Sequence, residues 1–412
     1  MTSTRVPLAG RTASPRTARA INDRLALQLL KDEGPLTAGQ LKSLTGLSRP
    51  TIADLVERLR GAGLIAVVGE TGADRRGPNA RVYGIVADSA HVAGVDVRAR
   101  SVAVCVADLL GHIHAEASLP VAADAEPARA AEATVDLVRR AARKAGAERL
   151  HHIGVGAPGL VDPATGELAA TEALPRWHRE LSTALQGAFG TPVLLENEVN
   201  LAAVAEQRLG VVRDRDTFVL LWLGHGVGAA VVLDRALRRG ASGGTGEIGF
   251  LPVPGTAGLP SATGCDGGFH SLVSSAAVCA LARGLGVPAD AADDAPAAEA
   301  AVRAAVEAGE RGEPFLDALA GRIAVGAAAV CAVLDPGCVV LGGEMGRAGG
   351  AALARRVEDR LRRLCPLRTQ VRAGVVGGGG VLRGAVLTAL DATQNQLFGA
   401  PWPTRPFRHA DG

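Results

Sequence analysis

The clearest hydrophobic pattern in the chain lies between residues 48 and 60. Ile52, Leu55, Val56 and Leu59 follow the i, i+3, i+4, i+7 spacing of one helical face. A proline at position 50 is tolerated, because first-turn amides have no intrahelical partner. The spacing predicts a helix with one buried face, and its first turn and opposite face carry the polar side chains of Ser48, Arg49, Thr51 and Arg58.

Two further helical patterns precede this one. The first predicts a helix over residues 20–33, with one face made of Ile21, Leu25, Leu29 and Leu30. In the second, Thr37 and Gln40 have capping-box spacing and predict a short helix that ends at Gly46. A short helix, a tight glycine turn and a helix with a polar amino-terminal face are the parts of a helix-turn-helix, which reads bases with the start of its second helix.

A hairpin pattern follows. Residues 64–70 and 81–86 predict paired strands, and the loop between them carries Arg75 and Arg76 beside a Gly-Pro pair. Such a wing can follow a phosphate backbone or enter a narrow minor groove. We expect double-stranded DNA to be contacted by Ser48, Arg49, Thr51, Arg58, Arg75, Arg76 and Arg81. The alternative is an αα-hairpin that binds protein, with the arginines in a solvated loop.

Charge is divided unevenly along the chain. Residues 1–86 hold 13 Lys and Arg against 7 Asp and Glu, a net charge of +6, whereas the remaining 31 and 35 give −4. A basic amino-terminal part on an acidic body indicates a polyanionic partner for that part. We expect residues 1–19 to be a disordered basic tail, residues 20–86 the DNA-binding domain and residues 398–412 a carboxy-terminal tail.

From residue 91 the pattern changes to apolar strands with helical crossovers, which predicts an α/β fold of two lobes. Strands are expected at 91–97, 102–108, 153–157, 193–195, 218–223, 227–233 and 338–341, with helices at 127–145 and after residue 198. Residues 289–308 are rich in Ala and Asp and predict a surface helix or loop with little chemistry.

Composition excludes several classes of protein. With 48% apolar residues and no apolar run long enough for a bilayer, the sequence predicts a soluble, cytoplasmic protein. The six cysteines form no CxC or CxxC pair, which argues against a disulfide framework and a cysteine-rich metal site. We expect them to be buried free thiols.

Four motifs in the larger part carry a resemblance. GVGAPGLVDP at 154–163, ENEVN at 196–200, GHGVG at 224–228 and GGTGEIG at 243–249 resemble the ROK family of bacterial repressors, open reading frames and sugar kinases. The resemblance covers about residues 90–395 and implies an actin/hexokinase-like (ribonuclease H-like) ATPase fold. Its small lobe would span 90–197 plus 380–397, and its large lobe 198–379. The winged helix ahead of it resembles the regulators of this family, such as the xylose repressors.

The same resemblance implies a sugar site in the cleft between the lobes. Its residues would be Pro158, Gly159, Asn197, Glu198, Glu247 and His270, and Gly342-Gly343 matches a turn near the nucleotide. The glycines of the 224–228 hairpin would let backbone amides approach a ligand closely, or serve the fold alone. His270 would bind sugar or simply pack in the loop.

This sequence departs from the family kinases at their catalytic positions. Where they have Asp-x-Gly-Gly-Thr-Lys, residues 96–100 read DVRAR, and Glu198 replaces the catalytic Asp. The extra methylene displaces the carboxylate by about an ångström, enough to cost on the order of a hundredfold in rate. We therefore expect no catalytic residue, no nucleotide cofactor and no enzymatic activity.

The family's zinc-binding loop also differs. Its CxCGxxGCxE cluster aligns with SATGCDGGFH at 261–270, so that Ser261, Thr263 and Gly268 replace cysteines and His270 replaces the sugar-binding Glu. Phe250 stands where the family has His. Zinc needs about four N, S or O ligands, so we expect no metal here.

These patterns predict a transcriptional regulator of sugar-metabolism genes, a repressor by resemblance, whose ROK domain senses a sugar or related metabolite. We expect a homodimer or homotetramer, since a dimer brings two recognition helices to two half-sites. The alternatives are a ligand-independent DNA-binding regulator with a decayed pocket and an ATP-dependent sugar kinase with a regulatory head.

Overall fold

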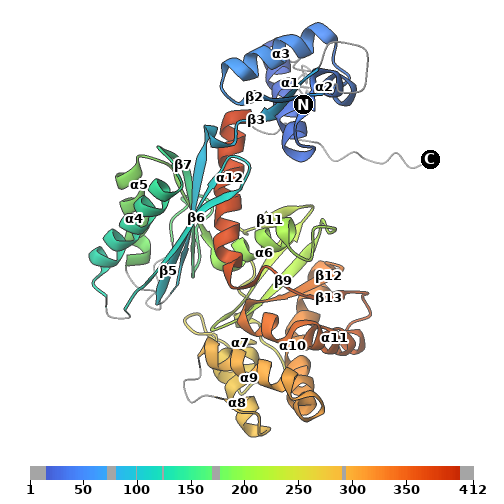
Figure 1. The fold of residues 1–412 in the computed structure, drawn as a ribbon. Helices are drawn as coiled ribbons and strands as arrows, with labels where there is room; N and C mark the ends of the chain where they lie inside the picture. Colours follow the sequence, from blue (N-terminus) through green and yellow to red (C-terminus); the bar gives the residue numbers. More distant parts are fainter. Residues whose placement is uncertain are drawn as a thin grey trace, which may run out of the picture.

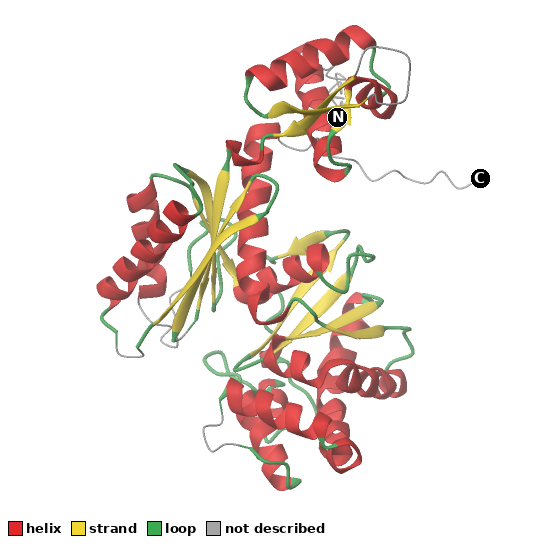
Figure 2. Ribbon diagram, in the orientation of Figure 1, coloured by secondary structure: helices red, strands yellow, loops and turns green. Residues whose placement is uncertain are grey.

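The computed structural model describes residues 15–71, 80–98, 100–122, 125–168, 177–289 and 294–399. They form a head at one end and a body of two lobes, each lobe built on a five-stranded sheet (Figures 1 and 2). The chain enters the small lobe from the head, crosses to the large lobe, and returns along a last helix that runs beside the small-lobe sheet (Figure 1).

The head is a winged helix-turn-helix. Its described elements are α1 (Pro15–Asp32), β1 (Leu36–Thr37), α2 (Ala38–Thr45), α3 (Arg49–Gly61), β2 (Ile65–Thr71) and β3 (Ala80–Ile85). The strands pair antiparallel in the order β1-β3-β2. The capping box between Thr37 and Gln40 is confirmed, and Gly46, with φ of 70°, ends α2 in the left-handed conformation that favours glycine.

Helix α1 differs from the prediction in its start and in its buried face. It begins at Pro15, five residues early, because proline is well tolerated in a first helical turn. Its buried side chains are Ala26, Leu27 and Leu30, whereas Ile21 and Leu25 are 39% and 41% exposed. The first half of α1 therefore extends beyond the core of the head.

The small lobe consists of one mixed sheet between two helical layers. Its elements are η1 (Ala87–Ser89), β4 (His91–Val97), β5 (Ser101–Asp108), β6 (Ile113–Pro120), α4 (Pro127–Lys144), β7 (Leu150–Ala157), α5 (Trp177–Phe189), β8 (Val193–Asn197) and α12 (Gly380–Phe398). The strand order is β6-β5-β4-β7-β8. Helices α4 and α5 cover one face and α12 the other (Figure 1). A Cβ on Gly154 would lie 2.1 Å from the Ala385 carbonyl, so only glycine lets α12 pack this closely.

The large lobe has the sheet order β11-β10-β9-β12-β13. Its elements are α6 (Glu198–Leu209), β9 (Phe218–Leu223), β10 (Val227–Leu233), β11 (Ala236–Arg238), η2 (Ile248–Phe250), α7 (His270–Val273), α8 (Ser275–Gly284), α9 (Ala295–Glu307), η3 (Gly309–Gly312), α10 (Glu313–Leu334), β12 (Cys338–Gly342), α11 (Gly343–Leu364), β13 (Gln370–Ala373) and η4 (Gly377–Gly379). This mixed α/β architecture is the fold class that the sequence predicts.

The surface helix or loop predicted at 289–308 is the helix α9, which exposes one face and buries Ala298, Ala301 and Val302 on the other. Small side chains allow α9 to pack against α11.

Within the described residues, Gly309–Leu334 is the one helix long and apolar enough to cross a membrane by length and composition, and half of its most apolar window is buried. We interpret α10 as a core helix.

The head packs directly on the body. Ile85 of the head, Leu109 after β5, and Leu390 and Phe398 of α12 belong to one hydrophobic cluster. Lys31 at the end of α1 donates a hydrogen bond to the Gln394 side chain at 2.8 Å. The position of the head is thus tied to α12, the helix that lies on the small-lobe sheet.

Candidate functional site

Helix α3 presents the predicted polar residues at its start. The Ser48 side chain caps the helix by accepting a hydrogen bond from the Thr51 amide at 3.3 Å, and the two hydroxyls lie 2.8 Å apart. Arg49 is exposed, while Ile52 and Leu55 on the opposite face are buried as the spacing predicts. Ser48 and Thr51 thus bond to each other, and Arg49 is the exposed positively charged side chain of this first turn.

Arg58 is placed differently from Arg49. Its guanidinium forms ion pairs with Asp23 of α1, at 2.5 Å, and with Asp54 one turn earlier in α3. Both partners belong to the head, so Arg58 fixes α3 against α1. Because its positive charge is paired within the head, Arg58 differs from the exposed Arg49, which we expect to contact DNA.

The wing is described only at its base. Arg81 is exposed on β3, opposite Glu70 of β2 in the register of the hairpin. Arg75 and Arg76 lie outside the described residues. The contribution of the wing loop to DNA binding therefore stays a prediction.

The second set of predicted residues lies in the body, where β8 meets α6. The Asn197 side chain donates a hydrogen bond to the Gly159 carbonyl at 2.8 Å and accepts one from the Val199 amide at 2.8 Å. It is thus the amino-terminal cap of α6 and ties the half-buried Pro158-Gly159 turn to that helix. This structural role uses part of the hydrogen-bonding capacity expected for a sugar.

Glu198, the first residue of α6, sits among charged groups. Burial raises the pKa of its carboxyl to about 7, and the neighbouring carboxylates of Asp96 and Glu344 act in the same direction, while Arg98 opposes them. Its carboxyl is therefore partly protonated near neutral pH. A carboxyl in that state can both donate and accept a hydrogen bond.

Glu247 and His270 belong to two segments that pack against each other, η2 with its preceding residue and α7. Glu247 is exposed and directly precedes η2 without a side-chain capping bond, and His270 begins α7, where burial lowers the pKa of its imidazole. A Cβ on Gly249 would lie 3.6 Å from the Cβ of His270. Gly243 packs against Val161, since a Cβ there would lie 2.0 Å from the Val161 carbonyl. The GGTGEIG segment is thus held beside the loop that follows Gly159.

The aligned zinc loop does not fit a four-ligand site. Among the described residues, Ser261 and Thr263 share a weak hydroxyl contact of 3.4 Å, Gly268 offers no side chain, and Phe250 cannot ligate a metal. Cys265 is half-buried, and burial raises the pKa of its thiol. Cys265 and His270 offer two ligands in this loop, fewer than the four of the tetrahedral set that zinc requires.

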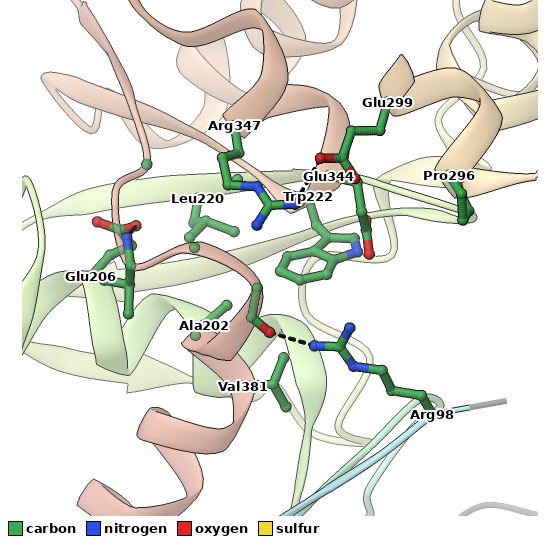
Figure 3. A pocket seen from close by; sticks show the side chains of 17 residues that line it. Arg98, Ala202, Glu206, Leu220, Trp222, Pro296, Glu299, Glu344, Arg347 and Val381 are labelled. Carbon is green, nitrogen blue, oxygen red and sulfur yellow. Dashed lines mark hydrogen bonds and ion pairs between the residues drawn. The ribbon is translucent and has the colours of Figure 1, made fainter. Parts of the chain in front are cut away.

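A pocket opens between the lobes, and two of the charged neighbours of Glu198, Arg98 and Glu344, line it. It is lined by the side chains or backbone of Arg98, Ala202, Glu206, Leu220, Trp222, Pro296, Glu299, Gly342, Gly343, Glu344, Arg347, Gly374, Val376, Gly377, Gly378, Gly380 and Val381. Figure 3 shows Arg98 entering from one side and Arg347 facing Glu299 on the other, at 2.9 Å. The pocket combines an indole, two guanidiniums and three carboxylates.

Arg98 closes the small-lobe side of this pocket. Its Nε donates to an Asp96 carboxylate oxygen at 2.9 Å, and its Nη2 donates to the Gly378 carbonyl at 2.5 Å. The second Asp96 oxygen and one Glu344 oxygen are buried without a hydrogen-bond partner among the described residues. Burial raises the pKa of Asp96, and Arg98 acts against that rise.

Comparison with known proteins identifies the body. The profile described as "ROK family" matches residues 92–392, about three quarters of the chain. The chain belongs to the ROK family. This confirms the resemblance that the four motifs carry.

Relatives within the family include both regulators and kinases. The xylose repressor of Caldicellulosiruptor bescii is 24% identical over 239 residues, 57% of this chain and 59% of the repressor. The xylose repressor of Bacillus subtilis is 23% identical over 256 residues, 57% and 61% of the two chains. The beta-glucoside kinase of Listeria innocua is 38% identical over 100 residues, only 24% and 34%. The matched region thus spans about three fifths of the length of these repressors.

Solved structures divide in the same way. A ROK family transcriptional regulator, a homologue of the E. coli Mlc protein, matches with a TM-score of 0.74 and 20% identity over 92% of this chain and 98% of its own. The ROK hexokinase from Thermus thermophilus matches with a TM-score of 0.61 and 27% identity over 74% and 99%. A match of 92% must include part of the head, so the likeness of fold extends beyond the body.

Sequence reasoning found the ROK motifs but missed most of the interlobe pocket. Trp222, Glu299 and the pair Glu344 and Arg347 come from three separate elements, β9, α9 and α11, and no local pattern joins these elements. The run of four glycines at 377–380 was an available signal, because it places bare backbone beside the Gly342-Gly343 turn.

Proposed function

We propose that this ROK protein is a DNA-binding transcriptional regulator, a repressor, that responds to a sugar or a closely related metabolite. The head supplies DNA contacts and the body binds the effector without phosphorylating it. The observation that carries the proposal is the winged helix-turn-helix with an exposed Arg49 in the first turn of α3, packed on a ROK body. The xylose repressors and the Mlc-homologous regulator support it.

In this proposal DNA binding depends on α3 and the wing. Ser48, Arg49 and Thr51 meet base edges or phosphates, and Arg75, Arg76 and Arg81 follow the backbone beside them. Arg58 contributes by holding α3 in place through Asp23. A homodimer or homotetramer would present two copies of α3 to two half-sites of an operator. Access to DNA would place the protein in the cytoplasm.

The effector site of this proposal is the wall formed by the Pro158-Gly159 turn, Asn197, Glu198, Glu247 and His270. Asn197 retains one amide hydrogen beyond the one that it donates to Gly159, and the carboxyl of Glu198 can donate as well as accept. A few convergent polar groups in a partly dry cleft are enough to bind a sugar.

Phosphoryl transfer requires more than binding. It needs positioned phosphates and an aligned base. Here Arg98 fills the place where family kinases have a glycine, and its guanidinium pairs with Asp96 and Gly378. Since the kinases' Gly-Gly-Thr-Lys is also absent, we propose that the ROK body uses no nucleotide cofactor and is not an enzyme.

A second candidate is a ligand-independent regulator with a decayed pocket. Two observations favour it: the Asn197 side chain is engaged by Gly159 and α6, and Phe250 stands where the family has His. A thermal-shift screen with monosaccharides, each with and without Mg-ATP, separates the candidates. The proposal expects one sugar class to raise the melting temperature without ATP consumption. No shift with any sugar would favour the second candidate, and sugar-dependent ATP consumption would establish a kinase.

A further inference from the structure

A cluster of histidine and aspartate side chains lies where the head joins the body. Its members are Asp88, His91, Asp108, His112 and His114, here called the junction cluster. Asp88 belongs to η1, the short segment that connects β3 of the head to β4 of the small lobe. His91 begins β4, Asp108 ends β5, His112 lies in the turn before β6, and His114 lies in β6.

The backbone brings these residues together by register. His91 and Asp108 are direct partners across the antiparallel β4–β5 pair, so their side chains project from the same face. Asp108 is buried, and one of its oxygens accepts hydrogen bonds from the Leu110 and His112 amides at 2.9 and 3.0 Å. These bonds fix the carboxylate and aim its other oxygen at the histidines.

The ligand-type atoms converge on that second oxygen. His114 Nε2 and His112 Nδ1 each lie 3.0 Å from Asp108 Oδ2. Asp88, Asp108 and His114 each offer one atom within 4.8 Å of the others. His91 Nε2 lies 3.8 Å from Asp88 Oδ1, and its ring meets that of His114 edge to face at 6.2 Å.

We propose that the junction cluster binds a divalent transition-metal ion of the zinc type, with Asp88, Asp108 and His114 as ligands and His91 as the fourth. Imidazole and carboxylate together select such ions, whereas Mg²⁺ and Ca²⁺ prefer oxygen alone. Zinc holds N and O ligands at about 2.0–2.2 Å, which places tetrahedral ligand atoms roughly 3.3–3.5 Å apart. The Asp88 side chain is 78% exposed on a three-residue turn, so it is free to move by the small distance required.

The remaining member has a supporting position. His112 Nδ1 is bonded to Asp108, the kind of contact that orients a ligating carboxylate from outside the metal's own shell. A bound ion would join η1 to the β5–β6 turn. Because η1 is the covalent connection between head and body, the ion would restrain the orientation of the head. This inference is independent of whether the body binds sugar.

The test uses the metal-stripped full-length protein titrated with Zn²⁺, followed by calorimetry and by melting temperature. His114→Ala and Asp88→Asn each remove one ligand, and Asp136→Asn removes a distant exposed carboxylate of α4 as the matched control. Asp108 is left intact, because it also caps the turn.

We expect one ion per chain and a rise in melting temperature in the wild type and the control. In each ligand variant the affinity should fall by at least about tenfold, and the rise should be lost. Binding that is equal in all four proteins would place the ion elsewhere and overturn the proposal. Absence of binding in the wild type would show that the cluster is a hydrogen-bonded turn only.

Discussion

Arg98 and Gly378 are joined across the interlobe cleft. The Arg98 guanidinium donates a hydrogen bond to the Gly378 carbonyl at 2.5 Å, although 280 residues separate the two in the chain. Through its second bond, to Asp96, the same side chain links β4 of the small lobe to the turn before α12. A residue that departs from the kinase motif has thus become a connection between the lobes.

Replacing Arg98 with Ala should lower the stability of the body. Asp96 would then be a buried carboxylate without its ion-pair partner, and the bond to Gly378 would be lost. Because the Arg98 side chain is 44% exposed, we expect a modest loss of about 1–2 kcal/mol in the free energy of unfolding, measured by urea denaturation. Exposed Arg100 provides the control substitution, Arg100→Ala. If the two variants are equally stable, Arg98 does not stabilise the contact between the lobes.

The structure also separates what local sequence could predict from what it could not. Helix α3 and the cap at Thr37 follow from spacings of three and four residues, and both appear as predicted. The cap at Asn197 was not predicted, although Asn is a preferred capping residue and directly precedes α6. By contrast, the Arg98–Gly378 bond and the buried face of α1 depend on which distant elements pack together, and no local spacing encodes that choice.

Arg49→Ala should weaken operator binding while leaving the fold intact. Arg49 is exposed in the first turn of α3, and loss of a base contact costs about 1–3 kcal/mol. Fluorescence anisotropy with operator DNA measures the change, and Arg139→Ala on α4 is the control in the body. If Arg49 instead contacts a phosphate, the salt slope should fall by about 0.9. Wild-type affinity and slope in Arg49→Ala would exclude it from the interface.

Arg58 should act through the fold of the head. Arg58→Ala and Asp23→Ala should each cost about 0.5–1 kcal/mol of stability, and the double variant little more than Arg58→Ala alone, since both single variants remove the Arg58–Asp23 ion pair. Asp23→Ala should reproduce the loss of DNA affinity seen in Arg58→Ala. If only Arg58→Ala weakens binding and also reduces the salt slope, then Arg58 contacts DNA as the sequence suggests.

Glu198 should make the stability of the body depend on pH. Its folded pKa of about 7 lies above the ordinary value of 4.5, so the folded state binds the proton more tightly than the unfolded state. The contribution of Glu198 to stability therefore falls as pH rises from about 4.5 to 7. Melting temperatures across this range should show a decline in the wild type that Glu198→Gln reduces, with Glu310→Gln as the exposed control. Parallel curves for all three proteins would contradict the buried setting of Glu198.

Glu247→Ala should separate sensing from DNA binding. Glu247 lies in the body, whereas the DNA-binding residues lie in the head. The variant should bind operator with wild-type affinity and lose the thermal shift caused by the effector sugar. Glu310→Ala, in η3, should behave as the wild type in both assays. A full sugar response in Glu247→Ala would show that the effector site does not depend on the GGTGEIG segment.

The central claim is that one chain binds DNA and releases or weakens that binding in response to a sugar. The most direct measurement is a mobility shift on the DNA of the protein's own promoter, repeated with a panel of sugars and sugar phosphates and with Mg-ATP alone. The account predicts a specific complex that one class of sugar weakens and that Mg-ATP leaves unchanged. A complex that no sugar alters would contradict the sensing claim, and the absence of any specific complex would contradict the account as a whole.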